Sequence, residues 1–268
     1  MADMARLALN TATVRQRWNL ARCIEGCARH GVAGIAPWRE GLAEMGVAAA
    51  GRQMRDAGLT VTSLCRAGLF TSGADAIEET RRAIGDAYAI GARWLVILAG
   101  GLPPGSKDLP GARAAALEGL ASVLPEARAA GVGLAIEPLH PMTCADRCVV
   151  STINQALDWA DALGTGTGVA IDAYHVWWDP ALEVAIARAR GRIFGLHVCD
   201  WLVPTRDLVF DRGMMGDGII DLPRLRALAE AAGYDGMIDV EIFSAADWWV
   251  RDPDDVLRIV KQRFADAV

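Results

Sequence analysis

The stretch VGLAIEPL, residues 132–139, is a short apolar run that carries one acidic side chain, Glu137. The same design recurs in TGVAIDAY (167–174), IFGLHVCD (193–200) and GMIDVEIF (236–243), where the polar residues are Asp172, His197 and Glu241. In a strand, each of these side chains points to one face while its apolar neighbours point to the other. An isolated buried carboxylate is unfavourable, so it is normally protonated, paired or bound to a metal. Four such groups predict a site.

The whole chain alternates strand-like and amphipathic helix-like segments. The expected strands are 7–10, 34–38, 60–65, 94–98, 134–139, 168–173, 194–199 and 237–243. A doubly wound sheet would normally have a glycine-rich phosphate loop after its first strand, but NTATVRQRW follows here. Eight βα units instead predict an α/β fold, a single (β/α)₈ TIM barrel, whose functional groups lie at the C-terminal ends of its strands. That is where the four polar residues fall.

Composition and charge restrict the expected number of domains, the partners and the location of the protein. The 268 residues are 53% hydrophobic and contain no linker, so we expect one domain over residues 1–268. The net charge of −6 argues against nucleic acid as a partner. No apolar stretch is long enough for a membrane span, and no export signal is evident, so a soluble cytoplasmic protein with reduced cysteines is expected.

The four polar residues have the composition of a divalent-metal site. Three carboxylates and one imidazole suit Mn²⁺, Mg²⁺ or Co²⁺ better than a thiolate-selected zinc site does. Asp239 has the same strand parity as Glu241 but lies one layer deeper. It supports the site from behind or pairs with a buried base, and the second, structural use is favoured.

Tryptophans gather after the expected strands. Six of the nine fall at strand ends or in the following loops, namely Trp38, Trp177, Trp178, Trp201, Trp248 and Trp249. Indoles at a barrel mouth stack on a sugar ring, form a lid or make contacts within a homo-oligomer. Trp177 and Trp201 are our candidates for contacts with a carbohydrate.

Longer motifs surround the four residues: EPLH (137–140), IDAYH (171–175), LHVCD (196–200), RGMMGDGIID (212–221) and DVEIF (239–243). On these motifs the sequence resembles the sugar phosphate isomerase/epimerase superfamily, the xylose isomerase-like TIM barrels that include ketose 3-epimerases and hydroxypyruvate isomerases. The resemblance implies that Glu137, Asp172, His197 and Glu241 bind one divalent ion, with Mn²⁺ the first choice. It also implies that His175 and Arg212 contact the substrate beside the metal.

The chemistry implied is proton transfer on a small carbohydrate. A metal-dependent isomerase or epimerase would act on a free ketose or related polyol through an enediolate, with Glu137 and Glu241 as acid and base. A phosphorylated sugar is less expected, since no basic stretch follows the last two strands.

Two alternatives remain. A metal-dependent lyase, dehydratase or deglycosidase acting on a 3-keto sugar or glycoside would use the same barrel, and His140 and Arg147 are candidates for contacts in such variants or are ordinary loop residues. A non-catalytic sugar-binding subunit is disfavoured, because binding alone does not require two glutamates on a metal.

Overall fold

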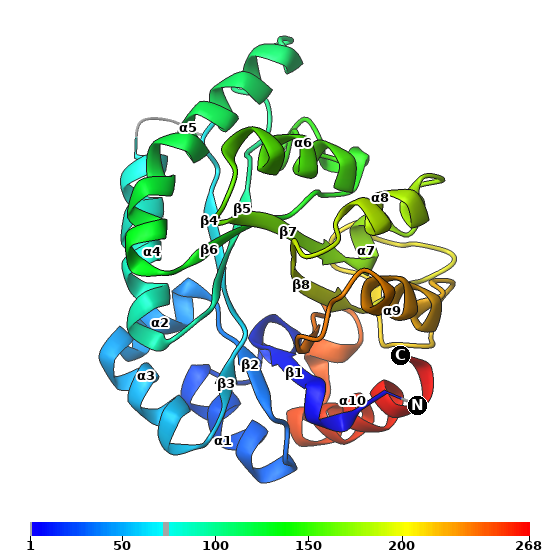
Figure 1. Cartoon of the computed structure of the whole chain (residues 1–268). Coiled ribbons are helices and arrows are strands. Elements are labelled where there is room, and N and C mark those ends of the chain that lie inside the picture. The colour runs from blue at the N-terminus through cyan, green and yellow to red at the C-terminus, as the bar shows by residue number, and fades with distance from the viewer. Residues whose placement is uncertain (1, 72–74) are drawn as a thin grey trace.

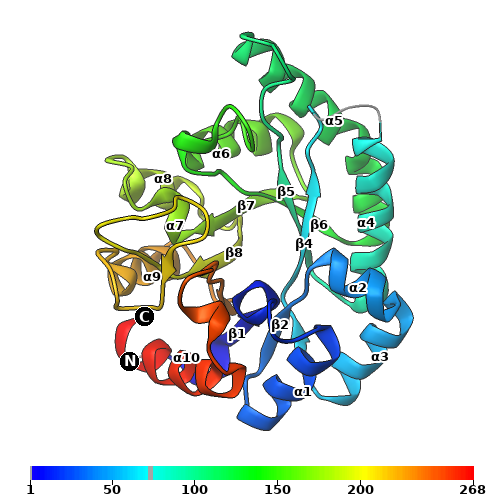
Figure 2. The same cartoon turned by 180° about the vertical axis from the view of Figure 1, so that it is seen from behind.

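The strands of the protein form a parallel barrel with helices on its outer side (Figures 1 and 2). The structure is a computed structural model that describes residues 2–71 and 75–268. The barrel strands are β1 (Leu7–Asn10), β2 (Gly34–Ala36), β3 (Thr60–Val61), β4 (Ser63–Gly68), β5 (Trp94–Leu98), β6 (Gly133–Ile136), β7 (Thr167–Asp172), β8 (Ile193–Val198) and β11 (Ile238–Val240). Their order in the sheet is β3-β2-β1-β11-β8-β7-β6-β5-β4.

The third strand is divided into two parts. The sequence predicts one strand over 60–65, whereas the structure interrupts it at Thr62 and gives β3 and β4. Because β3 pairs with β2 and β4 pairs with β5, the two parts together close the ring, and a parallel bridge between Trp38 and Cys65 joins the same two sides. With β3 and β4 taken as one strand, the described residues confirm the predicted (β/α)₈ barrel.

Amphipathic helices cover the barrel because each buries one apolar face against the strands. The helices are α1 (Leu20–His30), α2 (Arg39–Met45), α3 (Val47–Asp56), α4 (Ala76–Ile90), α5 (Leu109–Ala130), α6 (Ile153–Leu163), α7 (Ala173–Val176), α8 (Leu182–Arg188), α9 (Leu222–Ala231) and α10 (Pro253–Ala267). Short 3₁₀ turns are η1 (Met4–Arg6), η2 (Thr11–Val14), η3 (Pro141–Thr143) and η4 (Trp248–Val250). Gly131 ends α5 with φ 69°, a left-handed conformation that glycine adopts without strain.

Small side chains fill the barrel interior beneath the predicted site. Ala135, Ala170 and Gly195 have the same strand parity as Glu137, Asp172 and His197, two residues further along. The alternate positions carry larger apolar side chains. Among those that are fully buried are Leu134, Ile136, Val169, Ile171, Leu196 and Val240. Bulky groups therefore pack between strands and helices, and the interior leaves room for polar groups at the C-terminal ends.

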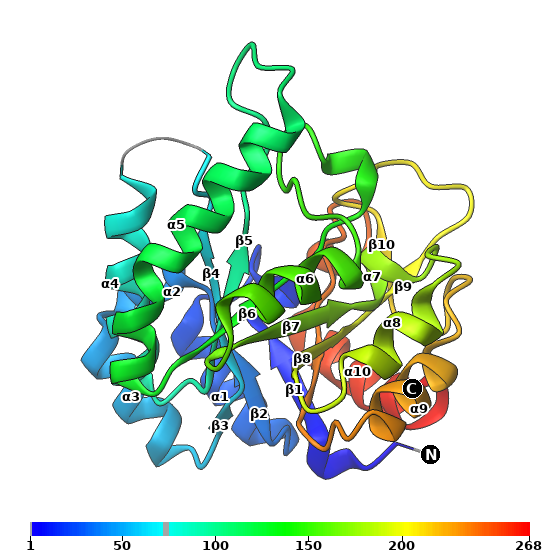
Figure 3. The ribbon, with the colours of Figure 1, turned by 45° about the horizontal axis from the view of Figure 1, so that its top comes forward.

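The loop after β8 contains a small antiparallel pair, β9 (Asp200–Trp201) and β10 (Arg212–Gly213). In the tilted view this pair lies beside α7, the short helix that follows β7 (Figure 3). The loop thus brings Arg212 back to the same end of the barrel as the end of β7. None of the helices in the described part of the chain is both long enough and apolar enough to cross a membrane.

Candidate active site

The four predicted metal ligands converge at the C-terminal ends of their strands. Asp172 is the last residue of β7 and His197 lies in β8, while Glu137 and Glu241 directly follow β6 and β11. Each offers one ligand atom, and these atoms all lie within 4.8 Å of one another. The four side chains are buried, and the most exposed of the residues, Glu137, retains 7% of its accessible surface. Residues up to 104 positions apart in sequence, 137 and 241, thus form one cluster.

The two glutamates lie just beyond the assigned strands, but the strand geometry continues through them. The Glu137 N–H donates to the Ile97 carbonyl at 3.0 Å, and the Glu241 N–H donates to the Val198 carbonyl at 3.1 Å. These bonds tie each glutamate to the neighbouring strand on one side. Their side chains therefore keep the inward direction that the parity of the sequence predicts.

His197 presents its two ring nitrogens to different partners. Nδ1 lies 3.2 Å from Glu137 Oε1 and 3.7 Å from Glu241 Oε2, whereas Nε2 lies 3.6 Å from Asp239 Oδ2. Asp239 in turn accepts a hydrogen bond from the Thr62 hydroxyl at 2.9 Å. A histidine that ligates through one nitrogen commonly points its other N–H at a carboxylate. Asp239 thus lies behind His197, on the side of the ring away from Glu137 and Glu241.

The cluster fits a divalent cation. Both ring nitrogens of His197 and Glu137 Oε1 are buried without a hydrogen-bond partner among the described residues. With His197 as the neutral imidazole that a metal ion requires, three carboxylates and the nearby Arg212 guanidinium would leave two negative charges uncompensated. Buried polar atoms without partners and buried unbalanced charge are both unfavourable, and one divalent ion would satisfy them together.

Burial and mutual repulsion set the protonation of the cluster. Burial raises the pKa of the Glu137 carboxyl, and Glu241 and Asp172 add to this rise. Burial acts in the same direction on Asp172, but Arg212 and His175 outweigh it and hold its pKa below the usual value. Burial would lower the pKa of His197, yet the contacts with Glu137 and Glu241 raise it well above normal. A proton on His197 therefore competes with any cation for the cluster.

Arg212 and His175 lie side by side at one wall of the site, and their contact with a substrate stays a prediction. Arg212 Nη1 donates to Asp172 Oδ2 at 2.8 Å and lies 3.4 Å from Glu241 Oε2, and its guanidinium sits over the Tyr174 ring. His175 Nδ1 accepts the His140 backbone N–H at 3.2 Å. Burial lowers the pKa of His175 to about 3, so the ring is neutral. Its Nε2 lies 3.2 Å from Arg212 Nη2 and 3.6 Å from Asp172 Oδ2, so the ring is held between these two groups.

Asp200 organises the loop that carries Arg212. Its carboxylate accepts the backbone N–H groups of Trp201, Gly216, Gly218 and Ile220 at 2.8–3.0 Å. Asp200 is fully buried at the start of β9, which pairs with the strand containing Arg212. The motif RGMMGDGIID therefore wraps around one carboxylate, and this fixes the direction in which Arg212 leaves the loop.

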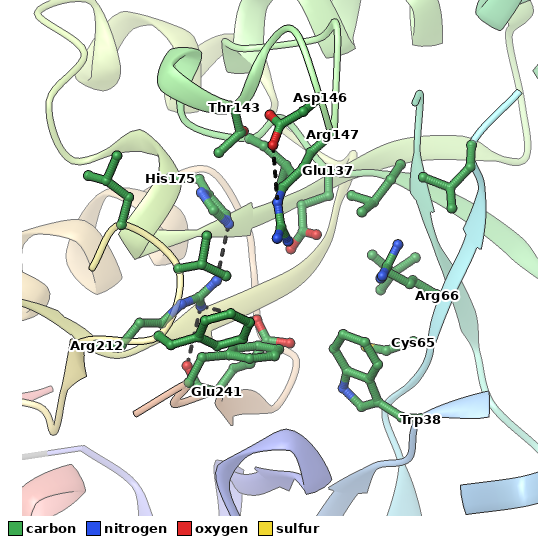
Figure 4. A pocket seen from close by; sticks show the side chains of 18 of the residues that line it. Trp38, Cys65, Arg66, Glu137, Thr143, Asp146, Arg147, His175, Arg212 and Glu241 are labelled. Carbon is green, nitrogen blue, oxygen red and sulfur yellow. Dashed lines mark hydrogen bonds and ion pairs between the residues drawn. The ribbon is translucent and has the colours of Figure 1, made fainter. Parts of the chain in front are cut away.

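A cavity of about 500 Å³ opens beside the cluster (Figure 4). Glu137 and Glu241 line it from two sides, and His175 and Arg212 form a third. The volume lies within the range of about 300–1,000 Å³ that is usual for small-molecule sites. A ligand in the cavity would thus meet both glutamates.

Asn10 and Trp38 support Glu241 from the first two strands. Asn10 Nδ2 donates to Glu241 Oε1 at 2.9 Å, and Trp38 Nε1 donates to Asn10 Oδ1 at 2.7 Å. Trp38 also lines the cavity. Sequence reasoning missed Asn10, although its signal was present: it is a polar residue that ends the apolar strand LALN (7–10).

The other tryptophans pack against aromatic neighbours. Trp201 lies 4.6 Å from the Tyr174 ring, 5.2 Å from the His140 ring and 5.5 Å from Trp177, measured between centroids. Among the described residues, none of Trp177, Trp201 and His140 belongs to the cavity lining. Their contact with a substrate therefore stays a prediction.

Trp248 and Trp249, also placed at the barrel mouth by the sequence, are buried. Trp249 donates its indole N–H to the Ala12 carbonyl at 2.8 Å, and its ring packs on Phe243. This residue thus holds the loop after β11 against η2.

A sequence model of the family described as the xylose isomerase-like TIM barrel matches residues 24–260. The chain belongs to this family. The match includes the strands that carry all four predicted metal ligands and the loop that carries Arg212, so the predicted family is confirmed. A comparison with curated proteins found no match.

Solved structures share the fold over nearly the full chain. Protein SMc04130 from Sinorhizobium meliloti 1021 is 50% identical, with a TM-score of 0.97 and 99% of each chain covered. The IolI protein, whose structure contains a zinc atom, is 20% identical with a TM-score of 0.84 and 98% of each chain covered. D-psicose 3-epimerase from Clostridium cellulolyticum H10, solved with D-tagatose, is 15% identical with a TM-score of 0.78 and 98% of each chain covered. At these identities the last two show the fold alone.

Proposed function

We propose that the protein is a single-domain, divalent-metal-dependent isomerase or epimerase that moves a carbon-bound proton of a ketose or related polyol. Glu137, Asp172, His197 and Glu241 would hold the ion, Mn²⁺ first and Mg²⁺ or Co²⁺ as alternatives. When bound, the ion would polarise the carbonyl and hydroxyl oxygens of the sugar and so acidify the hydrogen on the carbon between them.

The observation that carries this proposal is the placement of the two glutamates. Both line the cavity, and they come from β6 and β11, which β7 and β8 separate in the sheet. Glu137 Oε1 has no hydrogen-bond partner in the described structure, whereas Asn10 holds Glu241 Oε1 at 2.9 Å. Two carboxylates that reach one substrate carbon from different sides can act as base and acid.

Other groups of the site would bind and orient the sugar. The His175 ring is held by its contacts with the His140 backbone and Arg212, and the Arg212 guanidinium offers hydrogen-bond donors beside it. Neither group would exchange protons at neutral pH, because burial keeps His175 neutral and Asp172 helps to keep Arg212 charged. Glu137 and Glu241 therefore remain as the groups that transfer the proton.

The test is isotope exchange in deuterated water with a panel of ketoses and Mn²⁺-loaded protein. Wild type should place solvent deuterium at the carbon that changes, and product analysis separates an epimer, an aldose and an elimination product. Glu137→Gln and Glu241→Gln should each lower turnover by a factor on the order of 10²–10⁴, the usual worth of a general acid or base. Glu118→Gln, an exposed change on α5, is the matched control. Product without solvent deuterium would instead indicate an internal hydride shift.

A further inference from the structure

Three arginines besides Arg212 reach the cavity. Arg15 follows η2, Arg66 belongs to β4 and Arg147 lies in the loop after η3, and all three line the cavity. Figure 4 shows the Arg66 side chain between Glu137 and Trp38, and the Arg147 side chain entering from the loop beside Glu137. His175 and Arg212 lie on the other side of the view from Arg66. The cavity therefore has a second cationic wall, which the proposed proton transfer does not use.

The Trp38 ring positions two of these arginines. The Cζ atoms of Arg15 and Arg66 lie 5.4 Å and 5.5 Å from its ring centroid, within the range of cation–π attraction. The ring itself is fixed, because its N–H donates to Asn10. Arg15, which is exposed, and Arg66, which is partly buried, thus come from the end of η2 and from β4 onto one aromatic surface.

Carboxylates compensate this wall weakly. Within residues 2–71 and 75–268, the acidic partner nearest to any of the three is Asp146, whose Oδ2 lies 3.9 Å from Arg147 Nε. The metal-binding cluster does not require their charge either, since a divalent ion and Arg212 together balance its three carboxylates. Like charges gathered in one cavity repel each other, and an anion among them would relieve that repulsion.

We propose that Arg15, Arg66 and Arg147 bind an anionic group of the substrate, a carboxylate or a phosphate. This inference rests on the proposed function, which places the reacting carbon at Glu137 and Glu241. The substrate is then a ketose that carries its charged group at the end away from the metal cluster. Guanidinium groups bind such oxygens through paired, charge-assisted hydrogen bonds.

This inference changes the substrate class that the sequence favours. From the sequence alone a free sugar is expected, because no basic stretch follows the last two expected strands, 194–199 and 237–243. In the structure the arginines come instead from the end of η2, from β4 and from the loop after η3. Single arginines spread over residues 15–147 form no basic motif, so only the folded barrel brings them together.

The test compares three ligands with one carbon skeleton by isothermal titration calorimetry on the full Mn²⁺-loaded chain. D-fructose is neutral, D-fructuronate carries a carboxylate, and D-fructose 6-phosphate carries a phosphate at the same carbon. We expect at least one charged ligand to bind about tenfold or more tightly than D-fructose, as hydrogen bonds to a charged group allow. The better of the two identifies the anion.

Variants decide whether the arginines cause that preference. Arg66→Gln combined with Arg147→Gln should abolish it, whereas Arg52→Gln, an exposed change on α3, should leave it intact. Equal affinity for the three ligands, or a preference that survives in the double variant, would overturn the inference. Calorimetry measures binding without turnover. If the preference for a charged ligand holds while no ketose exchanges deuterium, the proposed reaction is refuted and the anion site is retained.

Discussion

Asp239→Asn should stabilise the metal-free protein and weaken its binding of metal. Asp239 is 2% exposed, and its Oδ2 lies 3.6 Å from His197 Nε2. Asparagine keeps the size of the side chain but removes its charge. The two effects have opposite signs because the carboxylate costs stability when buried, yet it orients the imidazole that would ligate the ion.

The stability effect follows from the pKa of Asp239. Burial, opposed in part by His197 and Thr62, raises this pKa from 3.8 to about 6. The folded state thus holds the proton more tightly than the unfolded chain, so stability is lost as the pH rises from about 4 through 6. Above pH 6, a rise in pKa of this size corresponds to a loss of about 3 kcal/mol in the free energy of unfolding. Asparagine has no carboxyl proton to lose, so the variant should recover much of this stability.

The effect on metal affinity follows from the contact with His197. Removing a carboxylate behind a metal-ligating histidine typically lowers affinity about 10–100-fold. That change corresponds to about 1.4–2.8 kcal/mol of binding free energy. The Thr62 hydroxyl can still donate to the amide oxygen of the new side chain, so its position should be retained.

Two measurements check both signs. Urea unfolding of EDTA-treated protein should show the variant more stable than wild type at pH 8 and about equal to it at pH 4, and calorimetry at pH 8 should show weaker Mn²⁺ binding. Asp266→Asn, an exposed change on α10 with the same change in charge, should alter neither quantity. Undiminished Mn²⁺ affinity in Asp239→Asn would refute its role in orienting His197, and a loss of stability at pH 8 would refute the buried-charge argument.

Four further outcomes are expected. Asp172→Ala and His197→Ala should each lose retained metal on elemental analysis, and full metal content in both would contradict the site. The Mn²⁺ affinity of wild type should rise by up to about tenfold per pH unit through neutrality, because the ion displaces a proton from His197, whose pKa is raised; a flat titration curve would contradict this. Burial lowers the pKa of His175 to about 3, so between pH 6.5 and 3 the imidazole is protonated in the unfolded wild type but not in the folded protein. His175→Asn should therefore lessen the loss of stability that urea unfolding shows as the pH falls through this range, and an unchanged pH profile would count against this. In ketose titrations Trp38→Ala should weaken binding more than Trp177→Ala, since only Trp38 of these two lines the cavity; the reverse order would favour a sugar contact at Trp177.

Strand parity explains why the barrel and the ligand cluster could be predicted. A buried strand permits one polar side chain only if something compensates it, so Glu137, Asp172, His197 and Glu241 each stand out from their apolar neighbours. Their meeting point follows because parallel strands present their C-terminal ends on one side of a barrel. The prediction needed no knowledge of contacts between distant residues.

The second wall of the cavity could not be predicted in the same way. Arginines such as Arg15 and Arg147 are ordinary in loops, and nothing local distinguishes one that faces a cavity from one that faces solvent. The tryptophans show the converse. Trp38 lines the cavity while Trp249 packs on Phe243, although both follow a strand. For loop residues, the path of the loop decides the contact, and that path depends on tertiary packing.

The two halves of the barrel divide the work of the site. The four proposed ligands come from β6, β7, β8 and β11, in the second half of the chain, whereas part of their support comes from the first half. Asn10 and Trp38 hold Glu241, and Thr62 holds Asp239 behind His197. Because β1 lies beside β11 in the closed sheet, these supporting groups reach the ligands directly. Closure of the barrel therefore adds these contacts to the supports that Asp239 and Arg212 give from the second half.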